Sequence, residues 1–487
     1  MSDLFPSLVP GLAAAGQATW RGLRCLGRGF RKLGRVLLLY VLPPLLVIHI
    51  AATLITGRLV GKELDRLSAA GHPLTLAEIA PPVPPPGENA ADVYQQAFDA
   101  YRVSTEEAEE ILSGEPSDSP EAMVVAREVV AANEKYFDLL DRASRMPQCV
   151  FPVDWEAGAG AVFAHWKYMR DAARMLGVRA KVLNADGRSD EALADCATVF
   201  RMARHARTEP SLIAQLFAGE LQSTITSAFE ETLCSGGLSA EACRDAFDQL
   251  RRSAERPSLS RGMETELAFG IWFFDYVRRG PIRDVASLIS VSCPAGALLR
   301  SEKRGRIALV LYRTVGRPVL NLDQLAHLRA WADFYAATER PWPESGERIE
   351  TTEASVDALP VWRTPVTKLA FPTFTRAVWT RELRTASVCA AQTALALAAY
   401  HGDHGAYPDS LADLEAEGWG LPADPFGGGP YRYRREGDGF VVWSIGPDVD
   451  DDNAARDYDA YREQTEADRE ERERNPYDYD VIFRCSH

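Results

Sequence analysis

The stretch that decides the fold is VLLLYVLPPLLVIHIAATLI, residues 36–55, in which no side chain carries a formal charge. Twenty helical residues at about 1.5 Å each cover the roughly 30 Å hydrocarbon core of a bilayer. The pair Pro43-Pro44 predicts a kink, which membrane helices tolerate. We therefore expect a single transmembrane helix over residues 36–56, in contact with the lipid bilayer.

The charges before this helix predict its orientation. Residues 1–35 contain six basic residues and one acidic residue, a net charge of +5. Basic residues next to a membrane helix stay on the cytoplasmic side. We expect the N-terminus in the cytoplasm of a bacterial inner membrane, with the bulk of the chain outside it. The alternative is a cleaved signal peptide, but the 35-residue leader is long and no A-x-A pattern follows the apolar run.

The composition limits the partners and the class of protein. The chain has 487 residues, of which 46% are hydrophobic and 25% charged, values typical of globular domains with a buried core. The net charge of -15 argues against nucleic acid as a partner, because phosphate binding needs a concentrated basic surface.

The middle of the chain divides into a spacer and a helical domain. Residues 57–90 include PPVPPPG at 81–87 and predict a Pro-rich spacer. Residues 91–345 have apolar residues at three- and four-residue spacing, which predicts a mainly α-helical domain. Residues 346–375 lack sustained periodicity and predict a linker.

The clearest helical unit is a helix pair between Val162 and His205, with a turn at 184–188. It resembles a tetratricopeptide-style repeat, but no second clean copy follows at the same period, so we expect a helical-hairpin array. Further helices are predicted at 212–234, 239–254, 262–278, 304–313 and 321–339.

Residues 376–487 have a different pattern. A long helix is predicted from about Arg376 to His401, followed by a short one in DSLADLEAEG. The segments PYRYRRE and GFVVWSIG predict two strands joined by a Gly-Asp-Gly turn, and DVIFRC predicts a third. The sequence thus predicts a C-terminal α/β module with a small antiparallel sheet.

This module resembles the C-terminal globular domain of the major pseudopilins of type II secretion. The matching residues are YPDSLADL at 407–414, DPFG at 424–427, Tyr431 with Tyr433, and SIGPD at 444–448. The resemblance covers about 110 of the 487 residues and implies one long helix on a small sheet, with a calcium-binding loop before the last strand. Here some 320 residues separate the module from the membrane segment and no processing site precedes that segment, so we do not expect the chain to polymerise.

The same loop is the candidate metal site. Asp448, Asp450, Asp451 and Asp452, with Asp480 on the last strand, offer the carboxylate oxygens that calcium prefers. A true EF-hand is excluded because Asn453 stands where that loop requires Gly. The alternative is a solvated acidic loop without a metal ion.

Eight cysteines raise the question of disulfides. Seven follow the membrane segment, and an odd number leaves at least one thiol unpaired within the chain. Cys234 and Cys243 flank a Ser-Gly-Gly turn, so either a local disulfide or two buried thiols is consistent with the sequence.

Catalysis has only weak candidates. His165 and His205 lie on predicted helices in a domain that also contains Glu209 and Glu220, and such pairs can perform acid–base chemistry. The sequence contains no H-E-x-x-H, G-x-S-x-G or P-loop motif. We therefore expect a membrane-anchored scaffold or binding protein. The alternatives are an adaptor of a type II secretion or pilus-like machine, in contact with envelope proteins, and an envelope hydrolase with its site in the helical domain.

Overall fold

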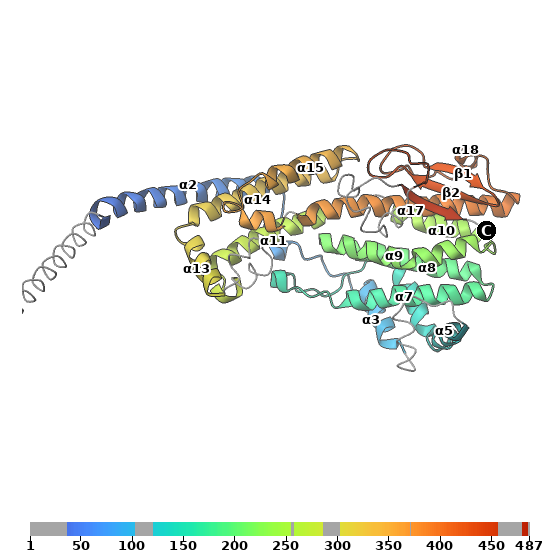
Figure 1. The fold of residues 1–487 in the computed structure, drawn as a ribbon. Coiled ribbons are helices and arrows are strands. Elements are labelled where there is room, and N and C mark those ends of the chain that lie inside the picture. The colour runs from blue at the N-terminus through green and yellow to red at the C-terminus, as the bar shows by residue number, and fades with distance from the viewer. Residues whose placement is uncertain are drawn as a thin grey trace, which may run out of the picture. The chain divides into compact units, whose positions relative to one another are not determined.

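The computed structural model describes residues 37–102, 120–254, 258–285, 302–370, 372–455 and 480–485. The fold is mainly helical, with one apolar helix near the N-terminus and a three-stranded antiparallel sheet near the C-terminus (Figure 1). Its contacts define two compact units. The first comprises Met1–Asp65 and Pro281–Leu325, and the second comprises Arg66–Gly280 and Ala326–His487.

The first unit contains the apolar helix. A π-helical turn, η1 (Leu37–Val41), precedes α2 (Leu42–Ala69), and the proline pair lies at the junction. Leu39–Ala69 is long and apolar enough to cross a membrane, and only 6% of its most apolar window is buried, so the predicted apolar helix is present; a membrane span and a signal sequence both have this length and composition. The basic segment 1–35 lies outside the described residues. The helices α13 (Glu302–Arg313) and the first part of α14 (Arg317–Thr338) complete this unit.

The predicted spacer is only partly extended. The helix α2 continues to Ala69, which is 13 residues beyond the predicted end at residue 56. A short 3-10 turn, η2 (Leu76–Glu78), follows, and the Pro-rich run 81–87 is free of regular structure. Helix continues because GKELDRLSA contains strong helix formers, whereas each proline in 81–87 lacks the backbone donor that a helix needs.

The second unit begins with helices that follow the sequence pattern closely. The predicted pair forms α7 (His165–Ala185) and α8 (Ser189–Ala206), joined by a turn in which Gly187 adopts a φ of +74°. The backbone N–H of Arg188 donates to the carbonyl of Leu183 at 2.8 Å and closes the end of α7. The other helices of this part are α3 (Ala90–Ala100), α5 (Pro120–Ala132), α6 (Glu134–Ser144), α9 (Leu212–Cys234), α10 (Ala240–Ala254) and α11 (Ser260–Arg279).

The segment 346–375 differs from the predicted linker. It contains most of α15 (Glu344–Asp357) and all of α16 (Pro365–Ala370). In α15, Ile349 and Val356 are buried, two helical turns apart on one face. These two buried apolar residues hold the helix against its neighbours. They are too few to give a recognisable helical periodicity in the sequence.

The C-terminal elements match the prediction. The long helix is α17 (Pro372–His404), the short one is α18 (Leu411–Ala416), and the strands are β1 (Arg432–Glu436), β2 (Gly439–Ser444) and β3 (Val481–Cys485). The strand order is β1-β2-β3, with Tyr433 opposite Val442 and Val442 opposite Phe483. Gly437, in the turn between β1 and β2, has a φ of +59°, which explains the Gly at this position.

The sequence predicts that these C-terminal elements form a module of their own, but in the structure they share a core with the preceding helices. One hydrophobic core includes residues of α7 to α10, of α17 and of the sheet. The Phe229 ring on α9 meets the Phe483 ring on β3 at 6.0 Å, and α17 lies beside α9 and α10 (Figure 1). From residue 377 to residue 401 no side chain is exposed, so α17 has to be covered on every face. The sheet covers part of α17 and the helical domain covers the rest.

Candidate functional site

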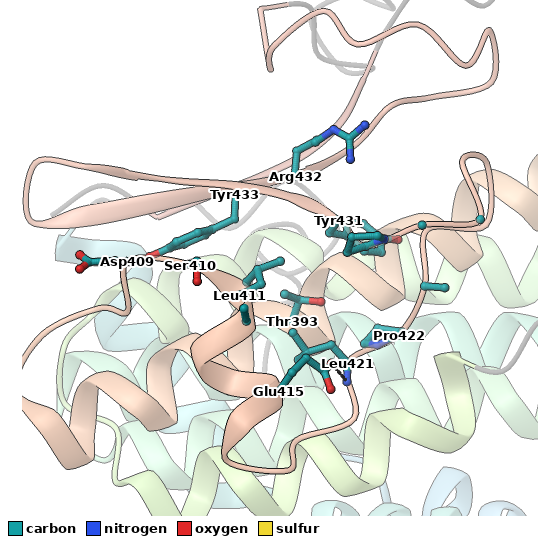
Figure 2. Close-up of a pocket in the computed structure, with 15 residues that line it drawn as sticks. Thr393, Asp409, Ser410, Leu411, Glu415, Leu421, Pro422, Tyr431, Arg432 and Tyr433 are labelled. Atoms are coloured by element: carbon teal, nitrogen blue, oxygen red, sulfur yellow. Dashed lines mark hydrogen bonds between the residues drawn. The ribbon is translucent and has the colours of Figure 1, made fainter.

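A cavity of about 670 Å³ lies between α17, α18 and β1 (Figure 2). We call it the α18 groove. Its lining is mostly apolar, with Leu411 and Leu421 on one side and Tyr431 and Tyr433 on the other. The other lining residues are Thr393, Asp409, Ser410, Ala412, Glu415, Pro422, Ala423, Gly428, Gly429, Pro430 and Arg432.

Local sequence signals build the helical wall of the groove. Ser410 begins α18 with a capping box, in which the Asp413 carboxylate accepts the Ser410 backbone N–H at 3.0 Å. The Glu415 carboxylate accepts the Leu421 N–H at 2.7 Å, which folds the following loop back toward the helix. The loop that leads to β1 is held by the buried Asp424, whose oxygens accept from the Phe426 N–H, the Ser444 hydroxyl and the Ile445 N–H.

Strand alternation builds the opposite wall. Figure 2 shows Tyr433 on the groove side of the strand and Arg432 pointing to the other side. The Tyr433 hydroxyl donates to the carbonyl of Pro408 at 2.7 Å, and the Tyr431 hydroxyl donates to the carbonyl of Ala386 at 2.8 Å. Burial raises the pKa of Tyr433 to about 12, so both tyrosines remain neutral donors near pH 7.

The polar groups of this groove are engaged in local contacts. The Ser410 hydroxyl and backbone are engaged in the helix cap, and the Asp409 carboxylate pairs with Arg435 at 3.0 Å. The lining contains no His, Cys or Lys side chain that could activate a nucleophile. Strand β1 is an outer strand of the sheet, so its far edge carries backbone groups that no other described strand pairs. Such an edge can bind an extended segment by strand addition.

The structure brings part of the predicted acidic site together. The loop 448–454 contains three non-glycine residues with positive φ, Val449 at 63°, Asn453 at 57° and Ala454 at 58°. A β-branched residue such as Val449 rarely adopts this conformation. The backbone of the loop is therefore strained at Val449.

Asp480 is the residue that this loop surrounds. It is fully buried, and its Oδ2 accepts the Ala454 N–H at 2.8 Å. Its Oδ1 is buried without a hydrogen-bond partner among the described residues. Burial, together with the charges of Asp452 and Asp451, raises the pKa of Asp480 to about 7. A buried carboxylate with an unused oxygen fits a bound cation.

The other acids fit a cation less well. Both oxygens of Asp451 are engaged, one by the Trp443 indole at 2.9 Å and one by Arg432 at 3.0 Å. Burial raises the pKa of Asp451, but these two hydrogen bonds outweigh it and lower the pKa below its ordinary value. Within the described ranges no three His, Cys, Asp or Glu side chains are grouped to hold a metal ion. Of the predicted ligands, Asp480 thus has a buried carboxylate oxygen without a hydrogen-bond partner among the described residues, and Asp448, Asp450 and Asp452 are not gathered around it as a ligand group.

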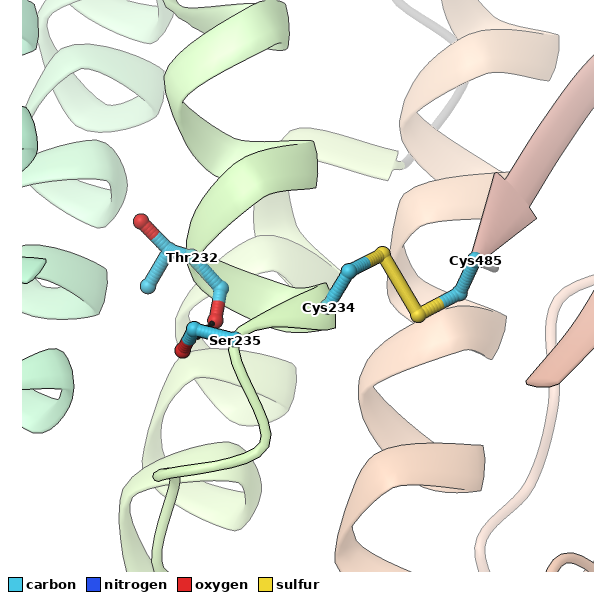
Figure 3. The surroundings of a disulfide bond; sticks show 4 residues. All are labelled: Thr232, Cys234, Ser235 and Cys485. Atoms are coloured by element: carbon cyan, nitrogen blue, oxygen red, sulfur yellow. Dashed lines mark hydrogen bonds between the residues drawn. A yellow bond between two sulfur atoms is a disulfide. The ribbon is translucent and has the colours of Figure 1, made fainter. Parts of the chain in front are cut away.

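One disulfide ties β3 to the helical domain. Cys234, at the end of α9, is bonded to Cys485, at the end of β3, with a Cα–Cα distance of 5.4 Å (Figure 3). Of the two alternatives for Cys234 and Cys243, the local disulfide is not formed, and Cys243 is a buried free thiol on α10. The sequence could not indicate this pairing, because the two cysteines are 251 residues apart and the shared core alone brings them together.

The candidate catalytic histidines are buried in satisfied contacts. The His165 Nε2 lies 2.5 Å from a Glu209 oxygen, the Trp166 indole donates to the other oxygen at 3.1 Å, and the Phe151 ring stacks on His165 at 4.0 Å. His205 lies between the Tyr94 hydroxyl, at 3.0 Å, and the carbonyl of Met146, at 2.9 Å. Burial lowers the pKa of His205 to about 4. These two pairs stabilise the packing of the helices.

Comparisons with known proteins give no relative: no protein family, no curated protein and no solved structure matches the chain. The α18 groove itself was not predicted from the sequence. Its lining overlaps the residues that carry the pseudopilin resemblance, at Asp409 to Ala412 and at Tyr431 with Tyr433, but a motif does not reveal the space between a helix and a strand.

Proposed function

We propose that the chain is a single-pass, membrane-anchored binding protein of a bacterial inner membrane. Its N-terminus lies in the cytoplasm, and the units that follow lie outside. The α18 groove is its ligand site. The observation that carries the proposal is this apolar groove of about 670 Å³, which is bordered by an outer strand and lacks a nucleophile with an activating base.

The occupant that fits the groove best is an extended peptide segment of another envelope protein. The unpaired edge of β1 offers backbone donors and acceptors, and the groove offers apolar contacts from Leu411 and Leu421. The pseudopilin-like character of this region supports an adaptor role in a type II secretion or pilus-like machine. A hydrolase is disfavoured, since the His165–Glu209 pair is buried and held by the Trp166 indole and the stacked Phe151 ring.

Two features support the topology. The apolar side chains of α2 are exposed along most of residues 39–55, as expected of a helix in contact with lipid. The Cys234–Cys485 disulfide fits an oxidising compartment, in which such bonds persist.

Protease added to spheroplasts, in which the extracytoplasmic side of the inner membrane is exposed, should digest the chain beyond residue 69. A protected C-terminus would overturn the proposed orientation.

The test of the groove uses two variants of one short helix. Ala412 is exposed and lines the groove, whereas Ala416 is exposed on the same helix but lies outside the lining. Full-length wild type, Ala412→Trp and Ala416→Trp are purified in mild detergent from their own membranes, and the bound proteins are identified by mass spectrometry. We expect a stoichiometric partner with wild type and Ala416→Trp that is lost with Ala412→Trp. A partner retained by Ala412→Trp would place binding elsewhere, and recovery of the chain alone would contradict the function.

We also propose that calcium binds the acidic loop, held by Asp480 together with Asp448, Asp450 and Asp452. The buried, unpartnered Oδ1 of Asp480 supports this proposal. The cation would neutralise the facing carboxylates and so stabilise the strained loop. Calcium should raise the melting temperature of wild type at pH 8, and a chelator should reverse the rise. Asp480→Asn should lose this response, and a response retained by that variant would exclude Asp480 as a ligand.

A further inference from the structure

The face of α13 that lies away from its core is apolar and exposed. Ile307, Val310 and Leu311 are 53%, 41% and 55% exposed, and Val315 in the following turn is 72% exposed. Spacings of three and four residues place the three helical residues on one face. Leu309, on the other side, is buried. Single exposed aliphatic residues are common on soluble proteins, but a continuous row of them marks an interaction surface. We call these four residues the α13 stripe.

Basic residues surround this stripe. Residues 302–317 contain five bases and one acid, a net charge of +4 within a chain whose total is -15. Arg306 and Arg313 lie on α13 itself, and Arg317 follows the turn. A helix with an apolar face and a basic border is typical of segments that lie in the interface of a membrane with anionic lipids.

Contacts within the first unit hold α13 near the end of the apolar run. The Asn321 side-chain amide, on α14, donates to the Thr56 hydroxyl at 3.1 Å and to the carbonyl of Thr53 at 3.4 Å. Gly57 lies beside the same amide, because a Cβ at this position would be 3.7 Å from it. Residues 53–57 are where α2 changes from apolar to polar sequence. The start of α14 is therefore held at the level where α2 would leave the bilayer.

A second contact ties α13 to that level. The Tyr312 hydroxyl, near the end of α13, donates to the Asp323 carboxylate of α14 at 3.0 Å. Asp323 is two residues from Asn321, so a short path connects the α13 stripe to the exit of α2.

We propose that α13 lies in the interface of the bilayer that α2 crosses, with the α13 stripe toward the acyl chains and its bases toward lipid phosphates. This gives the chain a second contact with the membrane, some 250 residues after the first. The inference rests on the proposed membrane span of α2.

The experiment measures the depth of three positions in the full-length protein. The protein is reconstituted in vesicles of phosphatidylethanolamine and phosphatidylglycerol, with one genetically encoded fluorescent amino acid at position 48, 311 or 124. Ile48 is an exposed residue of α2, Leu311 belongs to the α13 stripe, and Val124 is an exposed residue of α5. Quenching is measured with lipids brominated at shallow or deep acyl positions.

We expect several-fold stronger quenching at positions 48 and 311 than at 124. At position 311 the shallow bromines should quench more than the deep ones. Quenching at 48 with position 311 as weakly quenched as 124 would overturn the inference and leave the anchor intact. Absence of quenching at 48 would overturn the anchor, and the inference with it. Quenching at 311 chiefly by deep bromines would mean that α13 is inserted in the membrane, which also contradicts an interfacial position.

Discussion

Replacing Cys234 and Cys485 together by serine should destabilise the second unit strongly. The bond closes a loop of 251 residues. In the chain-entropy relation a loop of this length corresponds to about 5.5 kcal/mol of stabilisation at 25 °C, because the cross-link restricts the unfolded chain. Residual structure in the denatured state reduces the effect, so this value is an upper estimate. The double substitution avoids the free thiol that a single substitution would leave.

Urea unfolding followed by tryptophan fluorescence measures this effect on the full-length protein in detergent. Oxidised wild type, wild type with reductant and Cys234→Ser/Cys485→Ser are compared, with Cys243→Ala as a control for a buried thiol outside the bond. The reduced protein and the double variant should unfold at the same lower urea concentration, and the control should stay near wild type. Identical midpoints for oxidised and reduced wild type would refute the reasoning. So would complete alkylation of both cysteines without reduction in protein taken from its own membranes.

Two further perturbations test the acidic loop and the shared core. The folded-state pKa of Asp480 is raised to about 7, above its ordinary value of 3.8, so without calcium the folded state binds more protons than the unfolded state between these values. Asp480 should therefore make the stability of wild type in chelator fall as pH rises from 4 to 7, by at most about 4 kcal/mol. Asp480→Asn should have a shallower slope that is not zero, because burial also raises the pKa values of Asp195 and Glu266 to about 7. A melting temperature of wild type that is independent of pH in this range would show that Asp480 is solvated. Phe483→Ala, which removes the β3 ring that meets Phe229, should cost about 3–5 kcal/mol and lower a single melting transition seen by circular dichroism and by tryptophan fluorescence. Two separate transitions would mean that the sheet and the helical domain unfold independently.

The sequence predicts most elements of this fold because local patterns specify them. Residues 36–55 predict the apolar helix by length and lack of charge, and the turn at Gly437 predicts the hairpin of β1 and β2. The helix α15 was missed because Ile349 and Val356 are its few apolar anchors. In each of these cases an element is predicted from the sequence only when enough of its pattern lies within a few residues.

The arrangement of the elements depends on residues far apart in the chain. Residues 377–401 of α17 include Arg381, Glu382 and Arg384, which favour an exposed face, so the sequence does not reveal that this helix is covered on all sides. The acidic loop was predicted as a group, whereas the distinction between the buried Asp480 and the engaged Asp451 depends on Ala454, Trp443 and Arg432. The α18 groove depends on the exact separation of a helix and a strand, for which no local pattern exists.

The disulfide between α9 and the last strand has a consequence for how the chain matures. Synthesis proceeds at about 5–20 residues per second, so Cys485 follows Cys234 by roughly 12–50 s. During this interval Cys196 and Cys243 have already been synthesised and can react with Cys234. The native partner, Cys485, is synthesised last. The apolar faces of α9 and α10 likewise stay uncovered by α17 until the residues from 372 onward have been synthesised. In an oxidising compartment this order of emergence favours premature bonds, and thiol–disulfide exchange is needed to undo them before β3 can dock.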